Sequence, residues 1–350
     1  METNGHRPKM FSSESFGALF GNIPTVTGLI RKEPEILVFA AIQWIAIWLA
    51  YIGWTQMLHW IPDELWNAVE AHHSHGDKAS FYLINLVLLG WSFIIVCIVS
   101  YPIGLCTAAM IAVHDLRASN QESTIPKCLA IADRHLGRIW AFTALDSWIT
   151  VEAIMDRLPK KHYHRTALDE LLYYAWKIST MAIVPALVNG RDFLAAGQDS
   201  LKLLMKQPAR ALSLRLGYSA VCWVIGVLSY VGAIVTFWGF GDRDNAAHFM
   251  YNFYLLMGVP IFVSVGVISI VVRPFYLLGL AQFYTSLIDV RPEIEKDIQS
   301  IPKWEESLFS WRFMLFLAMS ITLAVTIIYA DRLGLTGWVT QLAHRDLMAL

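Results

Sequence analysis

The sequence predicts an all-α integral membrane protein, a polytopic bundle of about seven transmembrane helices. Of its 350 residues, 56% are hydrophobic and only 16% are charged, whereas soluble domains usually carry about 25% charged residues. The apolar residues gather in continuous runs close to the length of roughly 20 residues that a helix needs to cross a bilayer. A third observation is a short motif, Lys-Glu-Pro at residues 32–34 and Lys-Gln-Pro at 206–208, which recurs before an apolar run.

Seven apolar segments are expected to cross the membrane. The second is expected to bend, or to continue beyond the bilayer, near Pro102. The third and fourth are short and carry charges, so they either cross as a hairpin or enter the membrane only halfway. The sixth can break at Arg273 and Pro274 and continue to Leu287. The predicted spans are residues 36–58, 81–113, 139–154, 173–188, 216–238, 249–272 and 311–329.

Lys and Arg gather before the first span, after the second and after the fourth. Because basic residues mark cytoplasmic segments, these segments and the N-terminus are expected in the cytoplasm, with the basic loop at residues 157–165 as the exception. The first apolar run is full length and is expected to act as an uncleaved signal anchor. The predicted divisions are a cytoplasmic arm (1–35), a six-helix membrane domain (36–290) and a linker, additional span and tail (291–350).

An amphipathic helix is expected before two of the spans, at residues 126–140 and 192–205, where apolar residues recur at helical spacing. Pro126 suits a first helical turn, and Asp192 is the predicted N-cap of the second helix. With a degenerate copy of the motif at residues 132–138, these helices predict three parallel repeats of surface helix, outward span and returning span. Alternatively, any short helix before a span carries basic and small residues. The three units are residues 11–115, 118–190 and 191–290.

Residues 175–205 carry the most distinctive run of the chain. The run comprises Ala175-Trp176, Val184-Pro185-Ala186-Leu187-Val188, Gly190, Ala195-Ala196 and Asp199-Ser200-Leu201. It resembles an uncharacterised family of six-helix bacterial integral membrane proteins, which is distantly similar to the membrane domain of some glycerophosphodiester phosphodiesterases. The resemblance covers about residues 29–288 and implies a multi-pass protein of the bacterial inner membrane, without an assigned reaction. The chain departs from the family at Asn189, where an acidic residue is common, and in its additional span.

Three ionisable residues fall within predicted spans, where each charge costs about 2–3 kcal/mol or more. Asp146 and Glu152 lie in the third span, and Lys177 lies in the fourth. Counted from the outer ends of the apolar runs, Glu152 and Lys177 lie at similar depth, so they are expected to form a structural ion pair. Asp146 then has no evident partner. The alternative is a polar pathway for an ion, proton or headgroup past all three residues.

Histidines gather in segments expected on the outer face. Imidazole and carboxylate groups there can hold Zn²⁺ or Cu²⁺, but no spacing such as HExxH or paired CxxC sets a geometry. Solvated or interfacial histidines are therefore the default, and no cofactor is predicted beyond this possible metal ion. The candidate ligands are His59, His72, His73, His75 and His248.

The function expected from these features is that of a non-enzymatic membrane subunit or scaffold that binds lipids or partner membrane proteins. The net charge of −1 does not favour nucleic acid as a partner. No GxSxG, Walker A or paired-carboxylate motif is present in the sequence, so catalysis is not expected. The alternative is a transporter or permease that uses the region of Asp146, Glu152 and Lys177.

Overall fold

The structure is a computed structural model that describes residues 28, 30–60, 78–155, 167–240 and 260–288, and the single residues 314, 318 and 325. Within this part of the chain the protein is all-helical, which confirms the predicted all-α class. The helices are α3 (Glu35–Trp60), α5 (Lys78–Ala118), α6 (Ile125–Arg134), α7 (Leu136–Met155), α8 (Ala167–Ser179), α9 (Ile183–Val188), α10 (Phe193–Lys206), α11 (Pro208–Phe240), a π-helix (Ile268–Val272) and α13 (Arg273–Leu287).

Five helical segments of the described chain are long and apolar enough to cross a membrane. Each of them overlaps a predicted span, but α7 is not among them, because it carries Arg138, Asp146 and Glu152 within 20 residues. The additional span predicted at residues 311–329 lies outside the described residues, apart from single positions. The five segments are Glu35–Trp54, Leu88–Ala118, Asp169–Val188, Pro208–Thr236 and Pro260–Leu287.

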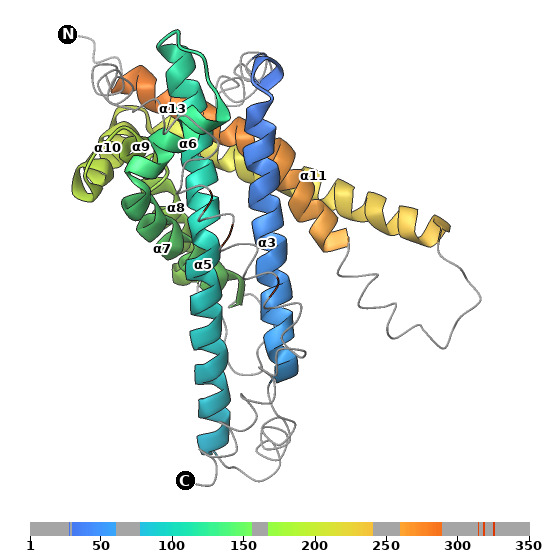
Figure 1. The fold of residues 1–350 in the computed structure, drawn as a ribbon. Coiled ribbons are helices and arrows are strands. Elements are labelled where there is room, and N and C mark those ends of the chain that lie inside the picture. The colour runs from blue at the N-terminus through green and yellow to red at the C-terminus, as the bar shows by residue number, and fades with distance from the viewer. Residues whose placement is uncertain are drawn as a thin grey trace, which may run out of the picture.

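The core of the bundle surrounds the second half of α5. This helix runs unbroken through Pro102 for 41 residues, about 60 Å, which is twice the thickness of the hydrocarbon core. Its small residues allow close packing, since a Cβ added at Gly104 would meet the Thr143 hydroxyl of α7 at 3.0 Å. Helices α3, α6, α7, α9 and α13 all pack on α5, whereas α11 projects away from it (Figure 1).

Each copy of the recurring motif lies at a junction between two helices. Helical residues 30–32 are followed by Glu33 and Pro34, and α3 begins at the next residue. Only His135 separates α6 from α7, and only Gln207 separates α10 from α11. The helix predicted over residues 126–140 was therefore too long, since it ends at Arg134, where the chain turns into α7.

Glu33 fixes the first junction to the end of α5. Its side chain is 3% exposed, forms an ion pair with Arg117 and accepts a hydrogen bond from the Ser123 hydroxyl. The residue between these two partners that reverses the chain is Asn120, with a positive φ of 56°. There the amides of Asn120 and Gln121 cap the last carbonyls of α5. We call this end of the bundle the basic end, because several arginines lie there.

The predicted fourth span is interrupted between α8 and α9. Pro185 has no N–H to donate to the carbonyl of Met181, so the helix cannot continue unchanged. Ser200 of α10 replaces the missing bonds, because its hydroxyl donates to the Ser179 carbonyl at 2.6 Å and accepts from the Ala182 amide at 3.3 Å. The interruption is thereby stabilised by a side chain from the neighbouring surface helix.

Replacing Arg117 with methionine is expected to lower the free energy of unfolding by about 3 kcal/mol, because the buried Glu33 carboxylate loses its cation. Local opening of α6 should increase as well. Burial raises the pKa of the Cys128 thiol on this helix to about 12, which keeps it unreactive in the native protein. The measurements are the melting temperature in detergent and the rate of Cys128 alkylation, read by peptide mass spectrometry.

The control is the double variant Glu33→Gln/Arg117→Met, which removes both charges together. It should recover most of the lost stability and bring the alkylation rate back toward that of the parent. A single variant that melts and alkylates like the parent would show that the ion pair does not hold this junction.

Candidate intramembrane polar site

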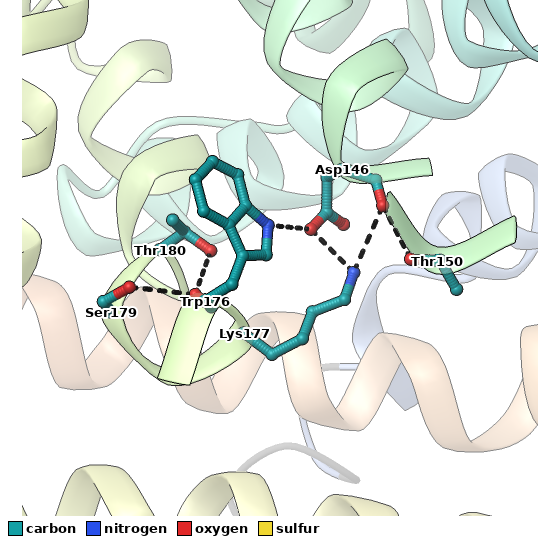
Figure 2. A network of polar contacts seen from close by, with 6 residues as sticks. All are labelled: Asp146, Thr150, Trp176, Lys177, Ser179 and Thr180. Atoms are coloured by element: carbon teal, nitrogen blue, oxygen red, sulfur yellow. Dashed lines mark hydrogen bonds and ion pairs between the residues drawn. The ribbon is translucent and has the colours of Figure 1, made fainter. Parts of the chain in front are cut away.

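An ion pair joins α7 to α8 within the membrane-spanning part of the bundle. The Lys177 ammonium lies 2.6 Å from Asp146 Oδ1, and the Trp176 indole N–H donates to the same oxygen at 3.1 Å (Figure 2). Lys177 also lies 3.5 Å from the Asp146 carbonyl oxygen, which accepts a second bond from the Thr150 hydroxyl at 2.6 Å. Two adjacent side chains of α8 therefore converge on one carboxylate.

The expected pairing of Lys177 with Glu152 is wrong, because Lys177 contacts Asp146 instead. Depth had been counted from the ends of the apolar runs, but α8 begins at Ala167 and α7 ends at Met155. Lys177 is thus ten residues into α8, and Asp146 is nine residues from the end of α7. Glu152 lies six residues, about 9 Å, further along α7 than Asp146.

The two charges of this pair differ in exposure. The Lys177 side chain is 11% exposed, whereas the Asp146 side chain is 31% exposed. The ammonium therefore depends on the carboxylate for its solvation, while the carboxylate is reachable from outside the bundle. Loss of Asp146 should cost more than loss of Lys177.

Two arginines from later helices join the pair. Arg215 of α11 and Arg273 of α13 both lie close enough to repel the Lys177 ammonium electrostatically. Tyr276 connects the group, since its phenol lies within electrostatic reach of Arg215, Asp146 and Arg273. We call Asp146, Lys177, Arg215, Arg273 and Tyr276 the intramembrane polar cluster.

Aromatic rings cover the guanidinium of Arg215. Its Cζ atom lies 5.7 Å from the centroid of the Tyr218 ring, and this ring stacks on Tyr276 with centroids 4.2 Å apart. Such contacts favour a cation over the ring faces. They contribute no negative charge, so they orient Arg215 without neutralising it.

The position of Arg273 depends on a π-helix. Pro274 cannot donate a backbone hydrogen bond, and the Arg273 amide instead reaches the carbonyl of Ile268, five residues earlier. The Arg273 guanidinium donates to Thr107 Oγ1 at 3.2 Å. The same hydroxyl oxygen lies 2.8 Å from the amide nitrogen of Gln43, which also donates to the Ile103 carbonyl at 2.9 Å. Arg273 is thereby linked to both α3 and α5.

The cluster carries an excess of positive charge. It contains three cations and one carboxylate, which gives +3 − 1 = +2 in formal charge. Among the described residues, neither arginine forms an ion pair with an acidic side chain. The sequence pattern places Arg215 among the basic residues of a cytoplasmic segment and Arg273 at a helix break, so it predicts neither arginine at a polar site. The signal that could have placed Arg215 is Pro208, which begins α11 eight residues before the predicted start of that span.

A second polar group lies at the basic end and is paired throughout. Asp199 forms ion pairs with Arg191 at 3.4 Å and Lys202 at 3.5 Å. Asp192, the predicted N-cap of α10, occupies the cap position, but its side chain pairs with Arg138 at 2.8 Å rather than with the helix amides. These contacts tie α10 to its neighbours and serve the fold.

The predicted metal ligands cannot be assembled from this structure. His72, His73, His75 and His248 lie outside the described residues, as does the side chain of His59. Among the residues that are described, no three His, Cys, Asp or Glu side chains come together in a way that could hold a metal ion. The metal site stays a prediction.

No family model, curated protein or solved structure matches the chain. The resemblance to six-helix bacterial membrane proteins therefore stays a prediction. The functional interpretation rests on the geometry of the described helices.

Replacing Asp146 with asparagine is expected to lower the free energy of unfolding by about 3 kcal/mol, because it leaves the buried Lys177 ammonium beside two guanidinium groups. Lys177→Met should cost less than Asp146→Asn, since the Asp146 carboxylate is the less buried of the two groups and keeps its indole donor. Melting temperatures in detergent measure both changes.

Glu152→Gln is the matched control and should melt like the parent, because Glu152 is not the partner of Lys177. The double variant Asp146→Asn/Lys177→Met should recover stability relative to Asp146→Asn alone. Equal losses for Glu152→Gln and Asp146→Asn would contradict the assigned pairing.

Proposed function

We propose that the protein is a non-enzymatic integral membrane subunit that binds lipid or a partner membrane protein along α11. The observation that carries the proposal is the lack of packing on this helix. None of the most apolar stretch of Pro208–Thr236 is buried against the described chain. A membrane helix with so little packing against the described part of its own bundle can satisfy its apolar surface through lipid or another protein.

The outward face of α11 has the spacing of a helix-packing seam. Val224, Leu228, Val231 and Val235 are all exposed and are separated by four, three and four residues, and Leu228 is 67% exposed. This spacing keeps one face of a helix toward a partner helix. The opposite side of α11 is used within the bundle, where a Cβ added at Gly226 would meet Ile268 at 3.3 Å.

The proposal includes the topology and location expected from the sequence. Six spans form three parallel hairpins and a seventh span follows them, with the N-terminus in the cytoplasm, and the resemblance to six-helix bacterial proteins suggests the bacterial inner membrane. The three helix junctions at Glu33, His135 and Gln207 support the repeat, since each separates a preceding helix from a longer one. The basic residues near these junctions support the orientation.

A photoreactive residue at position 228 is expected to crosslink to one membrane protein that also co-purifies stoichiometrically in mild detergent. The physical reason is the exposed seam of α11. Ile98 of α5 is a matched control, since it is also exposed and apolar but lies outside the seam. Mass spectrometry of both crosslinked samples identifies the captured molecules.

Crosslinking at position 228 to lipid alone, with one phospholipid class enriched, would support the lipid form of the proposal. A monodisperse monomer from native membranes that captures neither a partner nor a selected lipid would contradict it.

A second candidate function is transport through the region of Asp146 and Lys177, with Glu152 further along the same helix. Two breaks in helical structure favour it. The interruption after α8 begins three residues beyond Lys177, and the π-helix ends immediately before Arg273. Such irregularities often mark functional sites and allow a span to change shape.

In the transport interpretation, Asp146→Asn should abolish flux in proteoliposomes, because the site loses its one titratable acceptor. Lys202→Gln, on the exposed side of α10, should keep the flux of the parent. The assay is uptake across a panel of ions, lipids and small metabolites. No uptake of any panel member by the parent protein would count against transport.

A further inference from the structure

We propose that Arg215 and Arg273, with Lys177 beside them, bind a phosphate group, carried either by a lipid headgroup or by a soluble phosphate compound. This inference does not rest on the role of α11 as a contact surface. It follows from the charge and donor geometry of the intramembrane polar cluster. Neither the Asp146–Lys177 pair nor the exposed seam accounts for the two arginines.

The excess positive charge of the cluster favours the binding of an anion. Asp146 is committed to Lys177 through a 2.6 Å contact, so its charge is already compensated. The Thr107 hydroxyl accepts a hydrogen bond from Arg273, and the Tyr218 ring lies 5.7 Å from the Arg215 guanidinium, and neither group brings charge. An arginine inside a span is unfavourable when no counter-charge accompanies it. An anion seated between them removes this cost for both.

The donors suit a phosphate oxyanion. A guanidinium presents five N–H groups in a planar fork and binds phosphate in a bidentate manner. The two forks come from different helices, α11 and α13, with the Lys177 ammonium from α8 as a third positive group. One tetrahedral anion offers several oxygen atoms on different sides, and so it can accept hydrogen bonds from donors on three helices. A single carboxylate has only two oxygens for the same task.

The position of the cluster makes a lipid headgroup accessible. Arg215 is seven residues, about 10 Å, from the start of α11, and a headgroup layer is about 5–8 Å thick. A long arginine side chain can bridge the remaining distance. Exposed apolar side chains adjoin the cations, with Leu216 at 47% and Val271 at 46% exposure. They offer a surface on which acyl chains can lie while the phosphate reaches the arginines.

The test uses full-length protein stripped of lipid in detergent. Inorganic phosphate, short-chain phosphatidylglycerol and short-chain phosphatidylcholine are titrated separately, and melting temperature and native mass spectrometry report binding. We expect a saturable rise in melting temperature with at least one of the two anionic probes. In Arg215→Gln/Arg273→Gln the apparent affinity for that probe should fall about tenfold or more.

The matched control is Lys202→Gln/Lys206→Gln, which removes two positive charges from exposed positions of α10. It should keep its apparent affinity within about twofold of the parent, because these lysines lie outside the cluster. The ligand-free melting temperature separates binding from a structural role. If the two arginines have no counter-ion in the ligand-free protein, Arg215→Gln/Arg273→Gln should melt at the parent temperature or above. The reason is that the substitutions relieve the repulsion between the arginines and Lys177.

The separate titrations with inorganic phosphate and with the two lipids distinguish the source of the phosphate. A response to phosphatidylglycerol alone, with one lipid retained per protein, assigns a headgroup, and a response to inorganic phosphate alone assigns a soluble compound. The proposal is overturned if no anionic probe binds saturably, or if the α10 control loses as much affinity as the cluster variant. It is also overturned if the cluster variant binds normally. Failure of these tests leaves crosslinking at Leu228 unaffected, and the reverse also holds.

Discussion

The contact between Lys177 and Asp146 is the interaction on which the membrane part of this structure depends. An ammonium that is 11% exposed cannot stay charged among apolar spans without a nearby carboxylate. The pair joins α7, which is the most charged of the long helices, to α8, which ends two residues later. It thereby connects the least apolar hairpin of the bundle and positions Trp176 over the same carboxylate. The arginines of α11 and α13 lie near a carboxylate, that of Asp146, which is already paired with Lys177.

The described bundle has two regions that differ in how closely their helices pack. At the basic end, small residues of α5 allow five helices to pack around it, and Glu33, Asp199 and Ser200 have their polar groups paired. Toward the other end of the spans, α11 leaves this core and carries an exposed apolar seam. The polar cluster lies where these regions meet. A ligand there would contact helices from both, which gives it the means to couple the orientation of α11 to the rigid core.

The sequence indicated where most of the described helices lie but not all of their ends, since the helix expected over residues 126–140 ends at Arg134 and α11 begins eight residues before the expected span. Long apolar runs indicated the spans, and the motif at residues 32–34 and 206–208 indicated the helix junctions, since Pro ends one helix and begins another. Depth could not be read the same way, because helix ends extend beyond apolar runs by different amounts. Because of this difference, the sequence predicts Glu152 as the partner of Lys177, whereas the structure pairs Lys177 with Asp146. Arg215 and Arg273 could not be recognised as neighbours, because only tertiary packing brings α11 and α13 together.

We propose that the two guanidinium groups inside the spans bind an anion. An experimental structure from native membranes, determined without added phosphate, tests it most directly. The account predicts tetrahedral density within hydrogen-bonding distance of both Arg215 and Arg273, continuous with acyl chains over Leu216 if the ligand is a lipid. A carboxylate of the chain itself seated between the two guanidinium groups, with no room for a ligand, would contradict the account.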